Sequence, residues 1–254
     1  MKWTAVVLAG SRPGGDPFAH EFGTDLKALI SVAGEAMVRL PVRALLESRT
    51  VGKILVLSQA PERIANALPR ERRVEVRASK GTIAETMLGL MHDEQIEWPL
   101  LVTTADHALL DAATVDEFCV AASGADLAIA VVERANLLRR IPNAKRTWLK
   151  FRGGAYTGAN LFALSSPAVA PAIELWRSVE QDRKKAWRIV SVLGPHVLAA
   201  TALRLVSLDS VLAQLGSRLG LSMRAVRLAN PLAGVDVDKT EDHKLVEAIL
   251  EGSA

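Results

Sequence analysis

The chain has 254 residues, of which half are hydrophobic and 23% are charged. This composition excludes an intrinsically disordered chain, because such chains have too little apolar surface to offset the entropy of ordering. The formal net charge is +3, and the basic residues are spread along the sequence without a long basic tract. We therefore expect no nucleic-acid partner.

Cysteine content and hydropathy point to a cytoplasmic protein. The single cysteine, Cys119, has no partner for an intrachain disulfide and cannot by itself form a cysteine-based zinc site. No run of about 18 uncharged apolar residues is present, and the stretch from Lys2 to Leu8 is too short for the apolar region of a signal peptide. We expect no membrane partner.

Short apolar runs alternate with segments of helical spacing in the first half of the chain. This alternation is typical of β/α units, in which helices return the chain to a parallel sheet. It predicts an α/β fold: a three-layer α/β/α sandwich with a mostly parallel, Rossmann-like sheet. The predicted strands are Thr4–Leu8, Ile54–Leu57, Val74–Arg77, Leu100–Thr103 and Leu127–Val132, and the predicted helices are Met37–Glu47, Ile83–His92 and Val115–Ala122.

The pattern loosens after Val132, where we expect an elaborated, largely helical second half. Near the C-terminus, Val235–Asp238 is predicted as a strand that leads into a helix at Glu241–Leu250. No repeat or low-complexity linker interrupts the chain, which favours one domain. Between these parts we predict a strand at Ala159–Leu164 and helices at Ala168–Val179, Ala186–Leu193 and Leu208–Leu215.

Candidate phosphate-binding residues follow the first predicted strand. The turn from Leu8 through Ala9, Gly10 and Ser11 to Arg12 lies where an open α/β sheet has its ligand crevice. Glycine allows backbone N–H groups to approach a phosphate, and Arg12 adds a charge contact. The turn matches neither a Walker A loop nor a dinucleotide fingerprint. The alternative is a plain glycine-rich turn with a solvated arginine.

Two further positions offer contacts to a nucleotide. Lys27, between apolar neighbours, is a compact charge able to reach several phosphate oxygens, although lysines in such positions are often surface residues. Gly81 and Thr82 begin a predicted helix, whose N-terminal N–H groups favour a base or a phosphate. Thr82 and Glu85 also form the pattern of a capping box, which is a compatible structural interpretation.

Carboxylates suited to magnesium follow the later strands. Asp106 lies just beyond a predicted strand end, where oxygen ligands favour Mg²⁺. Asp236 and Asp238 alternate along the predicted strand, so only one of them can share a metal with Asp106. The structural alternatives are a turn cap at Asp106 and part of the helix cap at Asp238. His107 has no clear partner, so we favour a structural or surface position for it over the role of a catalytic base.

Five elements in this order resemble the nucleotidyltransferases of the nucleotide-diphospho-sugar transferase type, and within them the molybdenum-cofactor guanylyltransferase-like group. They are L-A-G after the first strand, K-A-L-I-S-V-A-G-E-A-M-V, G-T at a helix start, T-A-D-H after the central strand, and D-V-D-K-T-E-D-H-K-L near the C-terminus. The resemblance is good over residues 1–132 and 235–250 and thin between them.

The resemblance implies Mg²⁺-dependent transfer of a nucleoside monophosphate from an NTP to a phosphorylated small acceptor, with release of pyrophosphate. It implies a nucleotide-binding half at 1–132, an acceptor-side subdomain at 133–234, and a metal-site strand with a closing helix at 235–254. By position, Leu8, Ala9, Gly10, Ser11, Gly81 and Thr82 would hold the nucleotide, Arg12 and Lys27 the phosphates, and Asp106 and Asp238 the metal, with Arg12, Lys27 and Asp106 catalytic.

The acceptor region is the least defined part of the sequence. We expect Asn160 near the acceptor and the cluster Arg183, Lys184 and Lys185 as a clamp for its phosphate, unless that cluster is a solvated helix face. Ser11 replaces a glycine of the family loop, which leaves the role of Arg12 open. Two other functions stay possible: a glycosyltransferase of the same fold, and a nucleotide-binding protein without catalysis.

Overall fold

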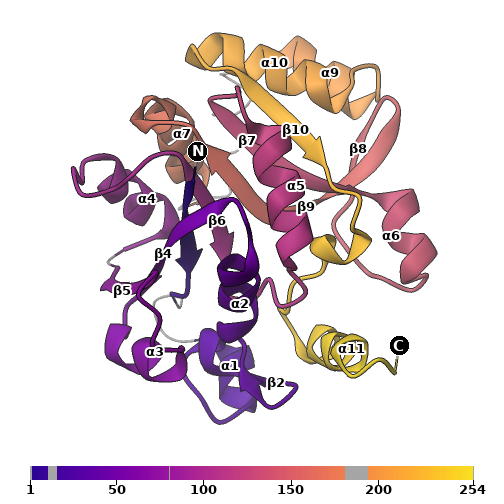
Figure 1. Cartoon of the computed structure of the whole chain (residues 1–254). Coiled ribbons are helices and arrows are strands. Elements are labelled where there is room, and N and C mark those ends of the chain that lie inside the picture. The colour runs from indigo at the N-terminus through magenta and orange to yellow at the C-terminus, as the bar shows by residue number, and fades with distance from the viewer. Residues whose placement is uncertain (1, 11–15, 80, 181–193, 254) are drawn as a thin grey trace.

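The computed structural model describes residues 2–10, 16–79, 81–180 and 194–253 (Figure 1). At its centre is a sheet with the strand order β10-β7-β9-β6-β1-β4-β5, in which β8 pairs with β9. The strands are β1 Trp3–Leu8, β4 Val51–Ser58, β5 Val74–Ala78, β6 Leu100–Thr104, β7 Leu127–Glu133, β8 Leu149–Phe151, β9 Gly154–Leu164 and β10 Met223–Arg227.

Helices surround this sheet, and a small two-stranded sheet lies apart from it. The helices are α1 Pro17–Glu21, α2 Arg39–Glu47, α3 Pro61–Ala67, α4 Ile83–Met91, α5 Ala112–Ala122, α6 Arg134–Arg140, α7 Ala170–Glu180, α9 Pro195–Ala202, α10 Leu208–Leu219 and α11 Thr240–Leu250. The short turns η1 Lys27–Leu29, η2 Pro167–Val169 and η4 Pro231–Gly234 are 3₁₀ helices, and the small sheet pairs β2 Ser31–Val32 with β3 Glu35–Ala36.

The predicted three-layer α/β/α sandwich is confirmed. Successive residues of a strand point to opposite faces, and in β1 both faces are apolar: Ala5 and Val7 join one core cluster and Val6 joins another. The first cluster is covered by α2, α5 and α6, and the second by α4 and α7. Burial on both sides explains why the strand reads as a continuous apolar run.

The strand directions bring several chain segments to one edge of the sheet. β1 runs parallel to both β4 and β6, and its last residue, Leu8, pairs with Thr104 at the end of β6. β9 runs antiparallel to β6 and β7, with Leu161 opposite Thr103. The ends of β1 and β6 therefore lie side by side, with β9 on the other side of β6. This edge is where ligands bind in open α/β sheets.

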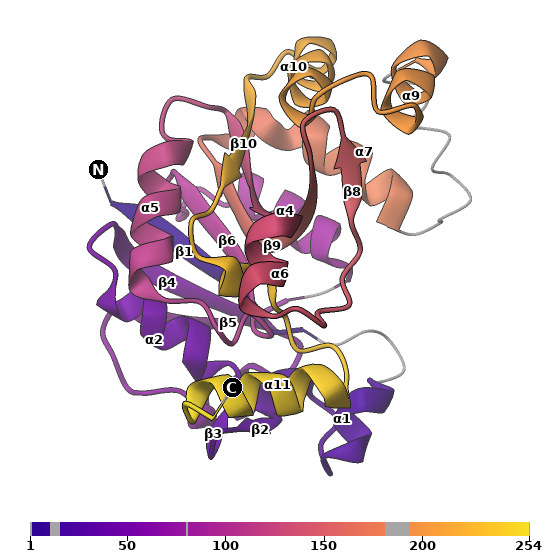
Figure 2. The same ribbon diagram turned by 90° about the vertical axis from the view of Figure 1, so that its right-hand side faces the viewer.

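The predicted strand at Val235–Asp238 is wrong. This segment forms no strand; it runs beside the end of β6, where the Val237 N–H donates to the Asp106 carbonyl at 3.1 Å. Val235 and Val237 are buried in the core, so the alternation of apolar and acidic residues serves an irregular segment instead of a sheet. α11 then packs beside α1 and the small sheet (Figure 2). The predicted helix Ala186–Leu193 lies outside the described residues.

Candidate active site

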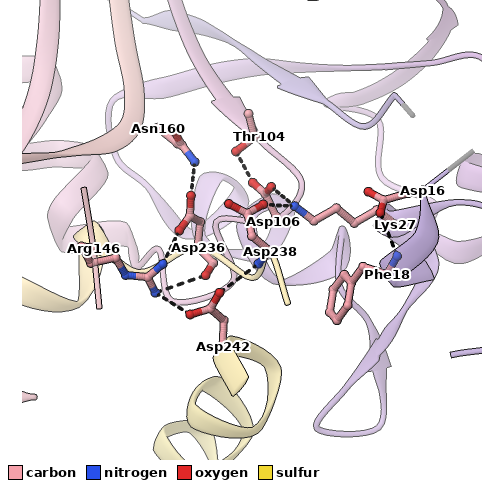
Figure 3. A network of polar contacts seen from close by, with 10 residues as sticks. All are labelled: Asp16, Phe18, Lys27, Thr104, Asp106, Arg146, Asn160, Asp236, Asp238 and Asp242. Atoms are coloured by element: carbon pink, nitrogen blue, oxygen red, sulfur yellow. Dashed lines mark hydrogen bonds and ion pairs between the residues drawn. The ribbon is translucent and has the colours of Figure 1, made fainter. Parts of the chain in front are cut away.

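Three predicted site residues meet at the ligand edge of the sheet. Lys27 begins η1, Asp106 follows β6, and Asp238 precedes α11 (Figure 3). The Lys27 Nζ lies 2.5 Å from Asp106 Oδ2 and 2.5 Å from Asp238 Oδ1. The two carboxylates therefore converge on one cation, although Lys27 is 79 positions from Asp106 and 211 positions from Asp238 in the sequence.

Local packing fixes the two partially buried members of this group. Ala28 and Ile30 beside Lys27 are buried in the core, which anchors the lysine stem. The Thr104 hydroxyl donates to Asp106 Oδ1 and orients the carboxylate, leaving Oδ2 for Lys27. The side chains of Lys27 and Asp106 are 15% and 16% exposed, whereas that of Asp238 is 61% exposed. The group is thus anchored on one side and open on the other.

The charge of Lys27 is sustained by its two partners. Burial lowers the pKa of Lys27, but the attraction of Asp106 and Asp238 outweighs burial, and the net pKa is raised above its ordinary value. Lys27 is therefore an ammonium ion at neutral pH. Its single positive charge offsets part of the repulsion between the Asp106 and Asp238 carboxylates.

A second ionic cluster lies beside the first. Arg146 donates to Asp236 Oδ1 at 2.8 Å and lies 3.2 Å from an Asp242 oxygen, while the Asn160 amide donates to Asp236 Oδ2 at 3.1 Å (Figure 3). Burial raises the pKa of Asp236, repulsion from Asp238 and Asp106 adds to this effect, and Arg146 opposes it. The cluster ties the segment before α11 to β9.

The two clusters share the wall of one cavity. It has a volume of about 350 Å³, which suits a small molecule. Its polar lining contains cations, carboxylates and hydroxyl or amide groups, so it can bind an anion and orient it. The lining residues are Lys145, Arg146, Thr147, Thr157, Gly158, Asn160, Asp236, Asp238, Lys239 and Asp242.

The predicted nucleotide loop is described only in part. Ala9 donates its N–H to the Leu57 carbonyl at 2.9 Å, which places the start of the loop at the end of β1. A Cβ atom at Gly10 would lie 2.8 Å from the Gln59 side chain, so a larger residue would require that amide to move. Ser11 and Arg12 lie outside the described residues, and their predicted roles stay predictions.

The capping box at the start of α4 is confirmed. The Glu85 N–H donates to Thr82 Oγ1 at 3.3 Å, and the Thr82 N–H donates to Glu85 Oε2 at 2.8 Å. Gly81 has a φ of +80°, and a Cβ atom there would collide with the Glu85 carboxylate. Glycine is therefore required at this turn for a structural reason, and the predicted nucleotide contacts of Gly81 and Thr82 stay a hypothesis.

The remaining predicted residues differ in what the structure shows. Asn160 joins the Arg146 cluster through Asp236. Arg183, Lys184 and Lys185 lie outside the described residues. His107 is buried, its Nδ1 lies 3.2 Å from Thr103 Oγ1, and burial lowers its pKa to about 4. A neutral, enclosed imidazole fits the structural role that we expected for it.

The site contains residues that the sequence pattern does not single out. Arg146 lies in a stretch with many basic residues, and neither its spacing nor its neighbours distinguish it from them. Asp242 belongs to the acidic first turn of α11, yet it also pairs with Arg146. Thr104 lies two residues before Asp106 in T-A-D-H, and its hydroxyl donates to that carboxylate, a contact that the motif alone does not indicate.

The donor chemistry of the first cluster fits a magnesium ion. Mg²⁺ binds oxygen ligands at about 2.1 Å, usually one or two carboxylates, and keeps waters and substrate phosphates in its other positions. Asp106 and Asp238 supply two carboxylates that already converge on a cation. Within the described residues, no set of three or more His, Cys, Asp or Glu side chains could hold a metal ion. The protein's share of a magnesium site would therefore be this pair.

Comparison with known proteins agrees with the geometry. The family model for the MobA-like NTP transferase domain matches residues 5–215. This chain belongs to that family. It is a nucleotidyltransferase, and nucleotidyl transfer is its general activity.

Solved structures share the fold over nearly the whole chain. A protein described as a hypothetical transferase from Thermus thermophilus is 30% identical, with a TM-score of 0.81, and the match covers 96% of this chain and 100% of that one. The 4-diphosphocytidyl-2C-methyl-D-erythritol synthase of Anaerococcus prevotii is 10% identical, with a TM-score of 0.60 and coverage of 98% and 96%.

A third solved structure, a CMP:2-keto-3-deoxy-manno-octonic acid synthetase in complex with CTP, is 10% identical, with a TM-score of 0.57, and the match covers both chains completely. At this identity the likeness concerns the fold alone. No curated protein sequence matches the chain significantly. In the described part of the nucleotidyltransferase, no helix is both long and apolar enough to cross a membrane.

Proposed function

We propose that this nucleotidyltransferase transfers a nucleoside monophosphate from an NTP to a phosphorylated small-molecule acceptor, with Mg²⁺, and releases pyrophosphate. The observation that carries the proposal is the convergence of Asp106 and Asp238 on one cation at the edge of the sheet where β1 and β6 end. NTP phosphates and a divalent cation are the ligands that such a group can hold together.

Lys27 has to change partners when the substrates bind. In the structure its ammonium group lies between the two carboxylates, at the position that a divalent cation would take. The triphosphate of the NTP offers Lys27 a new set of anionic oxygens, and its four-carbon stem lets the charge move while the backbone of η1 stays in place. We therefore expect NTP and metal to bind cooperatively: the triphosphate attracts Lys27, and the two carboxylates that Lys27 leaves become available to the metal.

Positioning and charge stabilisation supply the catalysis. Attack on the α-phosphorus builds negative charge on the phosphoryl oxygens and on the leaving pyrophosphate. Bound Mg²⁺ would neutralise part of that charge. In this proposal Lys27 holds the phosphates in line, Thr104 orients Asp106, and the turn that begins at Leu8, Ala9 and Gly10 contributes backbone N–H groups to the nucleotide.

The acceptor is assigned to the cavity beside the carboxylates. Its wall contains Lys145, Lys239 and Asn160 next to Asp238, so a phosphorylated acceptor bound there would face the nucleotide. Asn160 has a φ of +44°, a conformation that an asparagine tolerates better than most residues. We place the acceptor near Asn160, with Arg183, Lys184 and Lys185 as a second contact to its phosphate.

The test follows label from NTP to product. The protein is incubated with each of the four [α-³²P]NTPs, Mg²⁺ and a mixture of phosphorylated metabolites. We expect one NTP to give pyrophosphate and one labelled product, and we expect EDTA to stop both.

Two controls address the finer claims. The same mixture treated beforehand with phosphatase, which is then removed, should give no labelled product. If dephosphorylated acceptors are labelled equally well, the acceptor need not carry a phosphate. If transfer continues in EDTA, the reaction does not depend on Mg²⁺.

A further inference from the structure

A second cavity lies against the hairpin formed by β8 and β9. It has a volume of about 490 Å³, which is within the usual range for small-molecule sites. It shares no lining residue with the cavity beside Asp238. Trp148, Phe151, Gly154 and Ala155 are half-buried and form its floor, while Arg134, Lys150 and Arg204 are exposed and form its rim.

The rim carries three positive charges and the lining contains no carboxylate. Within the described residues, none of Arg134, Lys150 and Arg204 forms an ion pair. Arginines elsewhere in the described residues do pair with carboxylates, among them Arg43, Arg63, Arg77, Arg146 and Arg227. Cations gathered without a counter-charge repel one another and attract an anion.

The floor offers a flat aromatic surface beside these charges. The Arg134 guanidinium lies over the Trp148 ring, 5.8 Å from its centroid, so the indole already accepts one planar group. Phe151 packs against Tyr156 with 6.4 Å between the ring centroids, which fixes the end of the hairpin. An aromatic ligand can stack here and keep its negative groups near the rim.

The cavity is held by paired backbone. Lys150 pairs with Ala155 and Phe151 with Gly154 across the hairpin. The Arg152 N–H donates to the Val206 carbonyl at 2.9 Å, which ties the hairpin to the segment after α9 that carries Arg204. The floor and the rim therefore belong to one connected framework, as a preformed site requires.

We propose that this cavity is a second ligand site, which binds a small planar anion through stacking on Trp148 and ion pairs with Arg134, Lys150 and Arg204. It is separate from the site at Lys27, Asp106 and Asp238, and it does not depend on the nucleotidyl transfer proposed above.

Flavin mononucleotide and riboflavin test this site, because they share one planar ring system and differ by a phosphate. Binding is followed by flavin fluorescence anisotropy. We expect flavin mononucleotide to bind the wild-type protein at least about tenfold more tightly than riboflavin, a difference of about 1.4 kcal/mol. The double variant Arg134→Gln/Arg204→Gln should raise its Kd by at least about tenfold and leave riboflavin binding nearly unchanged.

Matched variants distinguish binding in this cavity from binding elsewhere on the protein. Trp148→Ala should weaken both flavins, and Trp148→Phe should restore part of the affinity because it keeps a ring. Arg139→Gln removes an exposed charge from the same helix, α6, without touching the cavity and should change nothing. Lys27→Met should also leave the Kd unchanged, since a loss there would place the flavin in the nucleotide site.

Three results would overturn the proposal. They are no binding of flavin mononucleotide at millimolar concentration, equal affinity for riboflavin, or affinity that is insensitive to the rim and Trp148 variants while circular dichroism shows them folded. Equal binding of inorganic tripolyphosphate, competitive with the flavin and unaffected by Trp148→Ala, would contradict the stacking part.

Discussion

Two acidic residues of one short segment, Asp236 and Asp238, serve two different cation clusters. Asp238 shares the Lys27 ammonium with Asp106, and its side chain is 61% exposed. Asp236 shares the Arg146 guanidinium with Asp242, and the Arg146 and Asp242 side chains are only 10% and 9% exposed. Asp238 therefore belongs to the more exposed cluster and Asp236, itself 28% exposed, to the less exposed one.

The chemistry of the two cations matches this difference. A lysine ammonium is a point charge on a flexible stem, so it can give up its carboxylates to a metal and turn to a phosphate. An arginine guanidinium is planar and contacts two carboxylates at once, so its position is fixed by both partners. We infer that the Lys27 cluster exchanges ligands during the reaction, whereas the Arg146 cluster holds the segment before α11 in position.

The largest expected effect is a large fall in kcat on replacing Asp106, which should not occur on replacing Asp236. Asp106→Asn keeps a hydrogen-bond acceptor for Thr104 but removes a charge, so kcat should fall by at least about 100-fold with little change in Tm. Asp236→Asn should lower Tm and keep kcat within about tenfold of wild type, because its charge faces Arg146. Steady-state kinetics and calorimetry measure both, and the reverse pattern would interchange the roles of the two clusters.

The next effect concerns Lys27. Lys27→Met keeps the apolar stem and removes the charge that is assigned to the NTP phosphates, so kcat/KM for the NTP should fall by roughly 100-fold. The control is Lys53→Met, a half-exposed lysine paired with Glu75, which should have no effect on turnover. A Lys27→Met enzyme as active as its parent at saturating NTP would remove Lys27 from the site.

A structural effect is expected at Arg146. Arg146→Met leaves Asp236 and Asp242 without their cation, which should lower the free energy of unfolding by about 3 kcal/mol, as when one partner of a buried ion pair is removed. Arg43→Met removes a half-exposed arginine that pairs with Glu35 and should cost less than about 1 kcal/mol. Denaturant unfolding compares the two variants. Equal losses of unfolding free energy in the two variants would show that Arg146 does not hold the segment before α11 in position.

The smallest effect is expected for the basic cluster of the second half. Replacing Arg183, Lys184 and Lys185 together with glutamine should raise the KM of the acceptor a few-fold, and should make it less sensitive to salt, while the KM of the NTP stays constant. A change in the NTP KM alone would assign the cluster to the nucleotide. No change in either would make it a solvated helix face.

Most strands of the sheet could be predicted from the sequence, because the spacing of apolar residues indicates which faces of a strand or helix are buried. The predictions of β1 and β6 are confirmed, as are those of α4 and its capping box at Thr82, since each depends on a local pattern. The strand predicted before α11 is wrong. Val235 and Val237 alternate with acidic residues as in a strand, but pairing with a neighbouring strand is a tertiary property that this alternation does not encode.

Site residues that lie in short motifs could be predicted from the sequence. Site residues that are defined only by long-range contacts could not. Lys27, Asp106 and Asp238 each lie in a recognisable stretch, and the fold brings them together. Arg146 forms ion pairs with Asp236 and Asp242, which lie far from it in the sequence. The residues around Arg146 show no pattern that would predict this contact. The cavity at Trp148 likewise combines residues of α6, of the hairpin and of the segment after α9.

The most direct test of the account is a Mn²⁺ titration followed by electron paramagnetic resonance, in which Mn²⁺ stands in for Mg²⁺. It compares the wild-type protein, Lys27→Met and Lys27→Met/Asp106→Asn, each with and without a non-hydrolysable analogue of the preferred NTP. Wild type should bind Mn²⁺ weakly alone and at least about tenfold more tightly with the analogue, because the phosphates coordinate the ion and also draw Lys27 away from the carboxylates. Lys27→Met should bind Mn²⁺ more tightly than wild type without nucleotide, and the added Asp106→Asn should abolish that gain. Equal Mn²⁺ affinities of wild type, Lys27→Met and Lys27→Met/Asp106→Asn without nucleotide would contradict the claim that Lys27 and the metal compete for the same two carboxylates.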